Sequence, residues 1–276
     1  EVPNSLHDIV RERLQKLQLV ADEMEILLAI AILQRPVSID ELSFLLTEIP
    51  TPILLEKLQK FEHLEFIKLI KDENETTYTF AHHLLGEIVI EYAKPSAEDY
   101  SHTAEKIEQL RIEQLENYAE ELARLYSEAG NVEKAYFYLK KAGENAEANY
   151  DNFKAVYFYR KILELNAKHR FLEARQYLEA MLKAAKLYDI QNDWENEAAI
   201  LAEAETAFSK ENNQKTLAQI LSARGRMFLR KSAYDKAEND LRQALEWFDK
   251  DDIQEYALAI TNLGIVHLQQ SKLSEA

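Results

Sequence analysis

The sequence predicts a mainly α-helical protein: a small helical domain closed by a β-hairpin, followed by an α-solenoid. Three observations predict this class. All five prolines lie between positions 3 and 95, two short alternating stretches stand at 65–70 and 76–80, and similar segments recur at a constant interval near the end. Because helix breakers are rare after Pro95, long helices are favoured there. We therefore expect one domain over residues 1–95 and a helical connector with repeats over residues 96–276.

The first domain is expected to begin with helices. The stretches "LHDIVRERLQKL" and "DEMEILLAIAIL" have apolar residues at helical spacing, and Pro36 ends the second one. "SIDELSFLL" begins another helix, with Ser38 as the N-cap and Glu41 three residues later in a capping-box pattern. A further helix covers residues 53–64, and "EFIKLI" and "TTYTF" on either side of "KDENE" predict a hairpin. Helices closed by a hairpin in this order are typical of a winged helix.

A winged helix often binds DNA through the helix before its hairpin, so the charge of this region matters. Residues 36–80 carry four lysines, no arginine and nine acidic residues, and the presumed reading helix offers only Gln59 and two lysines. A protein that reads a DNA groove needs basic contacts to phosphates and polar contacts to base edges. The charge therefore disfavours nucleic acid as a partner, and a DNA-binding transcription regulator is kept as the alternative function.

A repeat is visible in the second part of the chain. In the segments "LSARGRMFLRKSAYDKAENDLRQAL" and "ITNLGIVHLQQSKLSEA", the interval from Gly225 to Gly264 equals that from Ala237 to Ala276. These residues resemble the tetratricopeptide repeat, in which small side chains let two helices approach closely and stacked helix pairs bury a shared core. Ala198 stands one such interval before Ala237, so we expect the same period to reach back a further repeat.

Earlier copies of the repeat overlap. "YAEELARLYSEAGNVEKAYFYLKKAGENA" and "NYDNFKAVYFYRKILEL" both match the pattern, although Ala155 follows Ala135 at only about half of the interval. The helix from Val132 to about Ala146 is therefore expected to serve two overlapping repeats, with an unrelated helical bundle as the alternative. The matched positions are Leu122, Ala123, Tyr126, Gly130 and Ala135 in the first copy, and Ala155, Tyr159 and Leu163 in the second.

The two ends of the sequence lead to a further expectation. The sequence lacks an initial methionine and a signal-peptide pattern, and Ala276 stands where the second helix of a repeat would begin. We therefore expect a fragment of a longer protein whose repeat array is truncated at the C-terminus. Because an unpaired first helix exposes apolar surface, extending the chain by one helix pair should raise its melting temperature.

The order of these segments resembles a known family. Taken together, "VPNSLHDIVRERLQKL", the winged helix, "YTFAHHLLGEIVIEY" and the repeat opening "YAEELARLYSEAGNVEKAYFYLKKAGENA" resemble the region after the nucleotide-binding domain of STAND-class signalling ATPases. The resemblance covers nearly the whole chain. The family's signature of phenylalanine, any residue and histidine corresponds to Phe80 and His82. The matching residues after it are Leu84, Leu85, Glu87 and Val89.

The sequence also departs from the family pattern. Gly86 stands where the family often has arginine, Ile90 stands where it often has tyrosine, and the basic segment that usually follows is reduced to "EDYSHTAEKIEQL". The resemblance implies an ATPase module upstream of this chain. It also implies a winged helix that acts as a packing and autoinhibition element, with Phe80 and His82 as interdomain residues, and repeats that receive a signal.

The sequence lacks motifs for catalysis or cofactor binding. It has no cysteine, no Gly-x-x-x-x-Gly-Lys phosphate loop and no His-Glu-x-x-His. The best metal candidate is His83, Glu87 and Glu91, spaced by four along one helical face, but such a row is also the wet side of an amphipathic helix. We prefer the second interpretation and predict no catalytic, cofactor or metal site, and hence no enzyme activity, in this fragment. His82 is interpreted as a packing or hydrogen-bonding residue, next to Gly86, whose missing side chain leaves room for a neighbouring element.

The concave face of the repeats is the predicted binding surface. Side chains of the first helices line such a groove, which suits extended or helical peptides. Basic residues gathered there could receive a carboxylate-rich partner, or they could pair with the protein's own acidic residues. By register with the repeat, the groove residues are Arg124, Lys183, Arg226, Arg230, Asn262 and Gln269.

Composition bounds the remaining possibilities. The formal net charge is -16, and the longest apolar run, residues 26–33, is far shorter than the roughly 20 residues needed to cross a bilayer. The absence of cysteine suits a reducing compartment, so we expect a cytoplasmic protein without membrane contact. The predicted function is non-catalytic regulation and protein interaction. In this prediction the repeats sense a protein, an acidic peptide or another ligand, and the winged helix couples to an upstream ATPase domain of the same chain.

Overall fold

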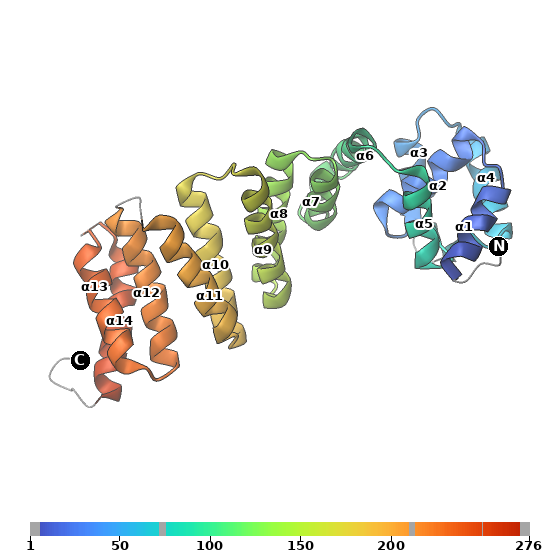
Figure 1. Cartoon of the computed structure of the whole chain (residues 1–276). Helices are drawn as coiled ribbons and strands as arrows, with labels where there is room; N and C mark the ends of the chain where they lie inside the picture. Colours follow the sequence, from blue (N-terminus) through green and yellow to red (C-terminus); the bar gives the residue numbers. More distant parts are fainter. Residues whose placement is uncertain (1–5, 72–75, 210–212, 250, 271–276) are drawn as a thin grey trace. The chain divides into compact units, whose positions relative to one another are not determined.

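The computed structural model describes residues 6–71, 76–209, 213–249 and 251–270 of the chain (Figure 1). The chain forms two compact units, Glu1–Tyr138 and Leu139–Ala276. Both are mainly α-helical, as the sequence predicts, and the small sheet of the described part lies in the first unit. The domain boundary predicted near residue 95 falls inside the first unit, because the helix after Ser96 packs against earlier helices.

The N-terminal part of the first unit combines five helices with a three-stranded antiparallel sheet in its described residues. The elements are α1 (Leu6–Lys16), α2 (Ala21–Leu33), β1 (Val37–Ser38), α3 (Ile39–Leu45), α4 (Thr51–His63), β2 (Ile67–Lys71), β3 (Thr76–Phe80) and α5 (His83–Ala93). Strand β3 lies between β1 and β2, and the predicted hairpin is confirmed, with Ile67 opposite Phe80. Strand β1 is not predicted from the sequence, because two residues are too few to show alternation.

Helix α2 forms the centre of this part. Its sequence "EILLAIAIL" is apolar on every side, as expected for a helix that is buried all round. Ile26 and Leu27 are completely buried, and so are Leu54 and Leu58 of α4. Each such side chain contributes about 1.5–3 kcal/mol to stability when it leaves water.

Gly86 lets the end of β3 lie against α5. A Cβ at this position would come within 3.1 Å of Cδ2 of Phe80, so a larger residue would push the Phe80 ring away. The room expected beside Gly86 therefore exists, and the neighbour that fills it is Phe80.

Three further helices complete the first unit: α6 (Ala97–Leu110), α7 (Ala119–Glu128) and the first half of α8 (Val132–Ala148), with a 3₁₀ turn at Ile112–Gln114. Glu108 of α6 joins them, because it accepts hydrogen bonds from the hydroxyls of Tyr126 and Tyr138 at 2.7 and 2.5 Å. Lys134 Nζ donates to the same carboxylate at 2.6 Å. Burial alone would raise the pKa of Glu108, but the hydrogen bonds from Lys134, Tyr138 and Tyr126 hold this pKa below its ordinary value.

The second unit contains the second half of α8 and a series of helix pairs. The helices are α9 (Asn152–His169), α10 (Ala174–Gln191), α11 (Trp194–Phe208), α12 (Gln214–Arg230), α13 (Tyr234–Trp247) and α14 (Ile253–Gln269). Each packs against the next in chain order from α9 to α14, and α12 also contacts both α10 and α14 (Figure 1). Contacts between neighbouring first helices are the pattern of a solenoid of stacked helix pairs.

The same turn joins four pairs of helices: α7 to α8, α8 to α9, α10 to α11 and α12 to α13. Two residues before each second helix the backbone is left-handed, at Gly130, Tyr150, Asn192 and Ser232. The residue after it donates its N–H to the carbonyl oxygen five residues back, at 2.9 Å in every case. Because this turn stands both before and after α8, that helix is the second of one pair and the first of the next, as predicted.

The fourth residue of each second helix is completely buried. It is Ala135 in α8, Ala155 in α9 and Ala237 in α13, but Glu197 in α11. Ala198, which was expected at this small-residue position, is only partly buried, because the starts of α11 and α13 are one residue further apart than the repeat interval predicts. A glutamate therefore stands where the other three helices have alanine.

Gly225 brings α12 and α13 close together. A Cβ at Gly225 would lie 2.7 Å from Cγ of Leu241 and 3.4 Å from the carbonyl oxygen of Ala237. The predicted role of small residues in helix approach is thus confirmed for this pair. The second helix expected to begin at Ala276 lies outside the described residues. In the described part of the chain, no helix combines the length and the apolar character needed to cross a bilayer.

Candidate functional site

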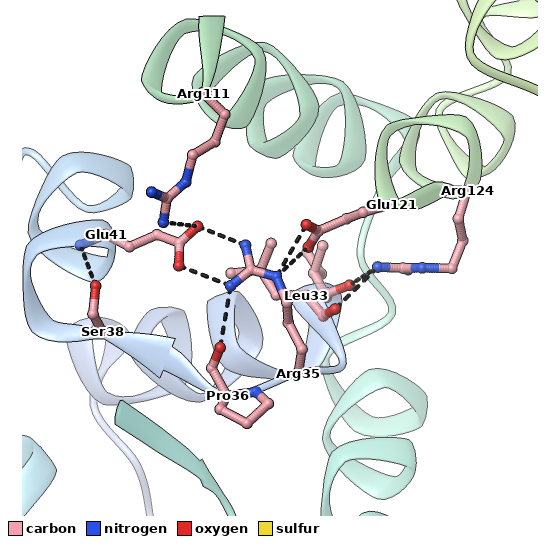
Figure 2. Close-up of polar contacts among 9 residues, drawn as sticks. Leu33, Arg35, Pro36, Ser38, Glu41, Arg111, Glu121 and Arg124 are labelled. Atoms are coloured by element: carbon pink, nitrogen blue, oxygen red, sulfur yellow. Dashed lines mark hydrogen bonds and ion pairs between the residues drawn. The ribbon is translucent and has the colours of Figure 1, made fainter. Parts of the chain in front are cut away.

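A charged junction lies where the ends of α2, α3 and α7 meet in the first unit (Figure 2). Arg35, two residues after α2, places its guanidinium between Glu41 of α3 and Glu121 of α7. Its Nη1 and Nη2 donate to the two carboxylate oxygens of Glu41 at 2.8 and 2.6 Å. Its Nε lies 3.0 Å from both oxygens of Glu121, and Nη1 also donates to the carbonyl of Pro36 at 3.1 Å.

The sequence around Glu41 predicts a helix cap and not the ion pairs of this junction. The capping box predicted at Ser38 is half formed, since the Glu41 N–H donates to Ser38 Oγ at 3.3 Å. The Glu41 carboxylate turns away from the cap to Arg35, and Nη2 of Arg111 lies 3.6 Å from it. A cap accounts for the spacing of Ser38 and Glu41 by itself, so the spacing gives no sign of a buried ion pair.

Arg124 belongs to the same junction (Figure 2). Its Nη2 donates to the carbonyl oxygens of Ile32 and Leu33 at 2.6 and 3.3 Å. These are the last carbonyls of α2, which have no partner within the helix, and a cation there also complements the helix dipole. Burial lowers the pKa of Arg124. Arg124 thus points to α2 and not, as predicted, into a peptide groove.

Tyr118 lies beside both guanidinium groups of the junction. The centre of its ring is 5.5 Å from Cζ of Arg35 and 5.0 Å from Cζ of Arg111, within the range of cation–π attraction. Burial lowers the pKa of Arg35, but the carboxylates of Glu41 and Glu121 more than offset this and raise it. Burial raises the pKa of Glu121, and the charge of Arg35 opposes this shift. The junction fixes the first helix of the repeats, α7, to the end of α2 through the hydrogen bonds of Arg35 and Arg124.

A groove of about 850 Å³ runs along the first helices of the second unit. Helices α10, α12 and α14 supply most of its lining, and the apolar part includes Leu178, Leu182, Phe248 and Leu258. The charged and polar lining residues are Arg175, Glu179, Lys183, Lys186, Asn213, Lys215, Thr216, Gln219, Ser222, Arg226 and Glu255. A hollow lined by both apolar and polar side chains has the composition of a ligand site.

Two of the predicted groove residues do line this groove. Lys183 and Arg226 are both among its lining residues. Lys183 Nζ, however, lies 2.8 Å from a carboxylate oxygen of Glu147, and Arg226 Nε lies 3.4 Å from Asp189. Pairing with the protein's own acidic residues, which the sequence left open as the alternative, therefore describes both side chains.

Arg175 and Lys186 were not predicted and differ from these two. Both are exposed on α10, and neither has an ion pair or side-chain hydrogen bond in the part of the chain that the structure describes, although the charge of Lys186 helps to lower the pKa of Glu147. They are eleven residues apart, which is three helical turns and places them on one face of the helix. That spacing was the available sequence signal. Lys215, across the groove, pairs with Asp252 but keeps about half of its side chain exposed.

The other three predicted groove residues lie elsewhere. Arg230 is not part of the groove lining, and its Nε pairs with Asp189 at 3.0 Å. Asn262 is buried within the second unit, and its Nδ2 has no hydrogen-bond partner among the described residues. Gln269 is exposed at the last residue of α14.

The two predicted interdomain residues have different surroundings. Phe80 is buried against Gly86 within the first unit. His82 is the N-cap residue of α5 and is exposed, and its side chain makes no capping hydrogen bond. Its ring centre lies 5.7 Å from that of His83. Among the described residues no side-chain hydrogen bond of His82 is found, and an interdomain role for Phe80 and His82 stays a prediction.

The row His83, Glu87 and Glu91 does not gather into a metal site. In the described residues, no three side chains of the kinds that bind metals come together. Glu91 instead forms an ion pair with Arg11, which joins α5 to α1. All three side chains are exposed, so the row lies on the polar side of α5.

The lysines of the presumed DNA-reading helix form ion pairs within the protein. Lys57 and Lys60 of α4 place their Nζ atoms 2.9 and 2.7 Å from the same oxygen of Glu23 on α2. Burial tends to raise the pKa of Glu23, but the hydrogen bonds from Lys60 and Lys57 lower it overall. These lysines hold a buried carboxylate in place, so the geometry lends no support to DNA binding through α4.

Comparison with known proteins extends this description at the level of fold. No protein-family model matches the sequence, and no curated protein matches it either. The fold is similar to that of BtubC (BKLC) from P. vanneervenii, at 14% identity and a TM-score of 0.50, with 80% of this chain and 82% of the other covered.

A second solved structure is a signal transduction ATPase with numerous domains and a tetratricopeptide repeat sensor from Pyrococcus horikoshii. The identity is 15% and the TM-score 0.37, and the match covers 98% of this chain but only 44% of the other. At such identities a likeness concerns the fold alone, and a TM-score this low supports no argument about function.

Proposed function

We propose that this chain is a non-catalytic regulatory and protein-interaction region whose helical repeats bind an acidic segment of a partner protein. The groove on α10, α12 and α14 carries the proposal, because Arg175 and Lys186 stand there exposed and without internal ion pairs in the described part of the chain. In a chain with a formal net charge of -16, two such cations beside apolar lining residues are a distinctive feature. Carboxylates of a partner would form charge-assisted hydrogen bonds with them.

The spacing of the two cations defines the partner segment. Eleven residues along a helix correspond to about 16 Å. An extended segment covers this distance in about five residues, because each residue advances about 3.3 Å. The partner would therefore carry two acidic residues about five positions apart, with apolar side chains between them that reach Leu182 and Leu258.

A peptide-binding experiment tests this function. The probe is a fluorescent peptide of about twelve residues in which glutamate, leucine and serine are mixed, and its counterpart carries lysine in place of glutamate. Replacing Arg175 and Lys186 with glutamine should weaken binding of the glutamate peptide about tenfold, because two exposed ion pairs contribute about 0.5–1 kcal/mol each. The measurement is fluorescence anisotropy at low and moderate salt.

The matched control changes Arg160 and Lys168 to glutamine. Both are exposed on α9 and outside the groove, so the net charge changes equally while the binding surface is kept. Equal weakening by the two double variants, or equal binding of the lysine peptide, would overturn the proposed function.

The charged junction supports a regulatory role for the N-terminal part. It ties α7 to α2 and α3 through Arg35 and Arg124, so a movement of α7 must either carry those helices with it or break the pairs. We propose that this part acts as a winged-helix-like domain that passes a signal from the repeats to an upstream ATPase domain. The motifs around Phe80 and His82 support this through their resemblance to STAND-class ATPases.

The regulatory role is tested in the natural full-length protein. The glutamate peptide should change its rate of ATP hydrolysis, and Arg35→Ala should abolish this response while the peptide still binds. A response that persists in Arg35→Ala would exclude the junction as the path of the signal, and a protein that hydrolyses no ATP would exclude the ATPase.

A further inference from the structure

Two carboxylates share a buried site between α10, α11 and α12 in the second unit. Asp189, near the end of α10, is 5% exposed, and Glu197, in the first turn of α11, is 0% exposed. Nε of Arg230 and Nε of Arg226, both on α12, lie 3.0 and 3.4 Å from the two carboxylate oxygens of Asp189 and form ion pairs with it. These pairs lack hydrogen-bond geometry, because Asp189 Oδ1 and Arg226 Nε have no hydrogen-bond partner in the described part of the chain. Neither carboxylate oxygen of Glu197 has a hydrogen-bond partner in the described part of the chain.

Glu197 occupies the fourth position of a second helix, where the other second helices have a buried alanine and not a charged residue. The equivalent residue is alanine in α8, α9 and α13, and each of these alanines is completely buried against neighbouring helices. An alanine there buries a methyl group without electrostatic cost, whereas an ionised carboxylate loses its water and gains no hydrogen bond in return. Packing alone therefore does not explain why α11 carries a glutamate.

The groups around Glu197 favour binding of a proton. From α10 it faces Asp189, from α12 it faces Arg226 and Arg230, and Lys231 follows directly after α12. Burial first, and the charge of Asp189 second, raise the pKa of Glu197 to about 7, even though the three cations oppose the shift. A like charge in the same buried site disfavours ionisation, so the charge of Asp189 favours the protonated form of Glu197.

We propose that Asp189 and Glu197 form a proton-binding site that makes the packing of α10, α11 and α12 sensitive to pH. With the proton bound, neutral Glu197 lies beside an Asp189 whose charge the two arginines balance. When the proton leaves, the charge of Glu197, which has no hydrogen-bond partner among the described residues, is buried beside that of Asp189. The folded state binds this proton more tightly than the unfolded state, whose glutamate titrates near 4.5. Stability is therefore lost as pH rises from about 5 through 7 and beyond.

Arg226 connects this site to the groove. It contacts Asp189 on its buried side and also lines the groove. An ionised Glu197 adds a negative charge near Arg226 and so makes the groove less favourable for an acidic segment, whose capture by Arg175 and Lys186 should weaken above pH 7. This consequence rests on the proposed function, whereas the proton site itself does not.

A carbon NMR titration measures the site directly. The side-chain carboxyl resonance of Glu197, identified by its absence in Glu197→Gln, should titrate with a midpoint near 7. A midpoint near the ordinary value of 4.5 would overturn the proposal.

Urea unfolding at several pH values measures the consequence for folding. In the wild-type chain the folding equilibrium constant should fall about tenfold between pH 6 and pH 8, as linkage requires for a pKa near 7. Glu197→Gln mimics the protonated form and should abolish this fall. Glu195→Gln removes the charge of an exposed residue on the same helix and should retain it. An unchanged fall in Glu197→Gln would contradict the proposal.

The glutamate peptide separates the two proposals. If the peptide binds, its affinity should drop between pH 6 and pH 8 in the wild-type chain but not in Glu197→Gln. If the peptide does not bind at any pH while Glu197 still titrates near 7, the proposed function fails and the proton site stands.

Discussion

Arg35 supports two buried carboxylates with one guanidinium. The side chains of Glu41 and Glu121 are only 2% and 12% exposed. Water therefore cannot take the place of Arg35 as the partner of either carboxylate. A buried pair of this kind need not add stability compared with apolar residues, but loss of one partner leaves the other charge without compensation. The effect of removing Arg35 is therefore larger than the worth of the ion pairs themselves.

Replacing Arg35 with alanine should lower the free energy of unfolding of the first unit by about 3 kcal/mol near pH 7. Lysine restores the charge but not the planar fork that serves both Glu41 and Glu121, so Arg35→Lys should recover only part of the loss. Chemical unfolding measures both values, with Arg160→Ala as a control at an exposed arginine. A loss below about 1 kcal/mol for Arg35→Ala would show that the junction does not hold α7 in place.

Glu108 should give a pH dependence of the opposite sign from Glu197. Its pKa is lowered in the folded state, so the stability it contributes is present above the ordinary value of 4.5 and is lost as pH falls through the lower folded value. Glu108→Gln should therefore cost about 2 kcal/mol at pH 7, because the donors Tyr126, Tyr138 and Lys134 lose a charged acceptor.

The difference between the wild-type chain and Glu108→Gln should shrink as the pH is lowered towards 3. Unfolding by urea across this range measures it. A difference of the same size at pH 7 and pH 3 would mean that Glu108 stabilises the fold through shape and not through its charge.

For single residues, the sequence shows which side chains are charged but not which of them form ion pairs within the protein. Lys57 and its partner Glu23 are 34 residues apart, and no local pattern connects them. Arg175 and Lys186 could have been found from their common face on α10, but the register of the repeat pointed to Lys183 in the same helix. Charges are thus assigned reliably only when the partners from other helices are known.

Helix pairs in the second unit depend on small residues at their contacts. Gly225→Ala would gain up to about 1 kcal/mol of helix propensity. The added Cβ would, however, stand 2.7 Å from Leu241 Cγ, and such overpacking costs about 1–3 kcal/mol. We expect a net loss of about 1 kcal/mol in the stability of the second unit, measured by thermal unfolding.

Gly143→Ala is the matched control for this substitution. The nearest atom to its added Cβ would be Cζ of Tyr159 at 3.3 Å, which a small movement of the ring relieves. Its stability should therefore stay near that of the wild-type chain or rise slightly. Stabilisation of equal size by both alanines would contradict a tight contact between α12 and α13.

Elements were predicted more completely than contacts. The helices, the hairpin, the repeat interval from Gly225 to Gly264 and the double use of α8 follow from apolar spacing and turn residues. The burial of Glu197 does not follow from the sequence, because Ala198 and Ala199 beside it satisfy the same small-residue pattern. The starts of α11 and α13 are one residue further apart than the repeat interval, and this additional residue buries Glu197 in place of Ala198. Sequence spacing alone does not show where the additional residue lies.

The charge of the whole chain acts against the partner that the groove favours. With a formal net charge of -16, the protein repels an acidic peptide at long range. This repulsion is screened beyond about 8 Å at physiological salt, whereas contact with Arg175 and Lys186 acts at hydrogen-bond distance. Composition thus indicates the sign of the long-range field, and only the folded structure shows where exposed cations such as Arg175 and Lys186 line a groove.

Methyl NMR spectra of Leu178, Leu182 and Leu258 test the central claim most directly, because all three line the groove. The glutamate peptide is predicted to shift their resonances in the wild-type chain and in the variant with Arg160 and Lys168 changed to glutamine. The shifts should be lost when Arg175 and Lys186 are changed to glutamine. Shifts confined to leucines outside the groove lining, such as Leu229 and Leu245, would contradict binding in the groove, and so would equal shifts with the lysine peptide.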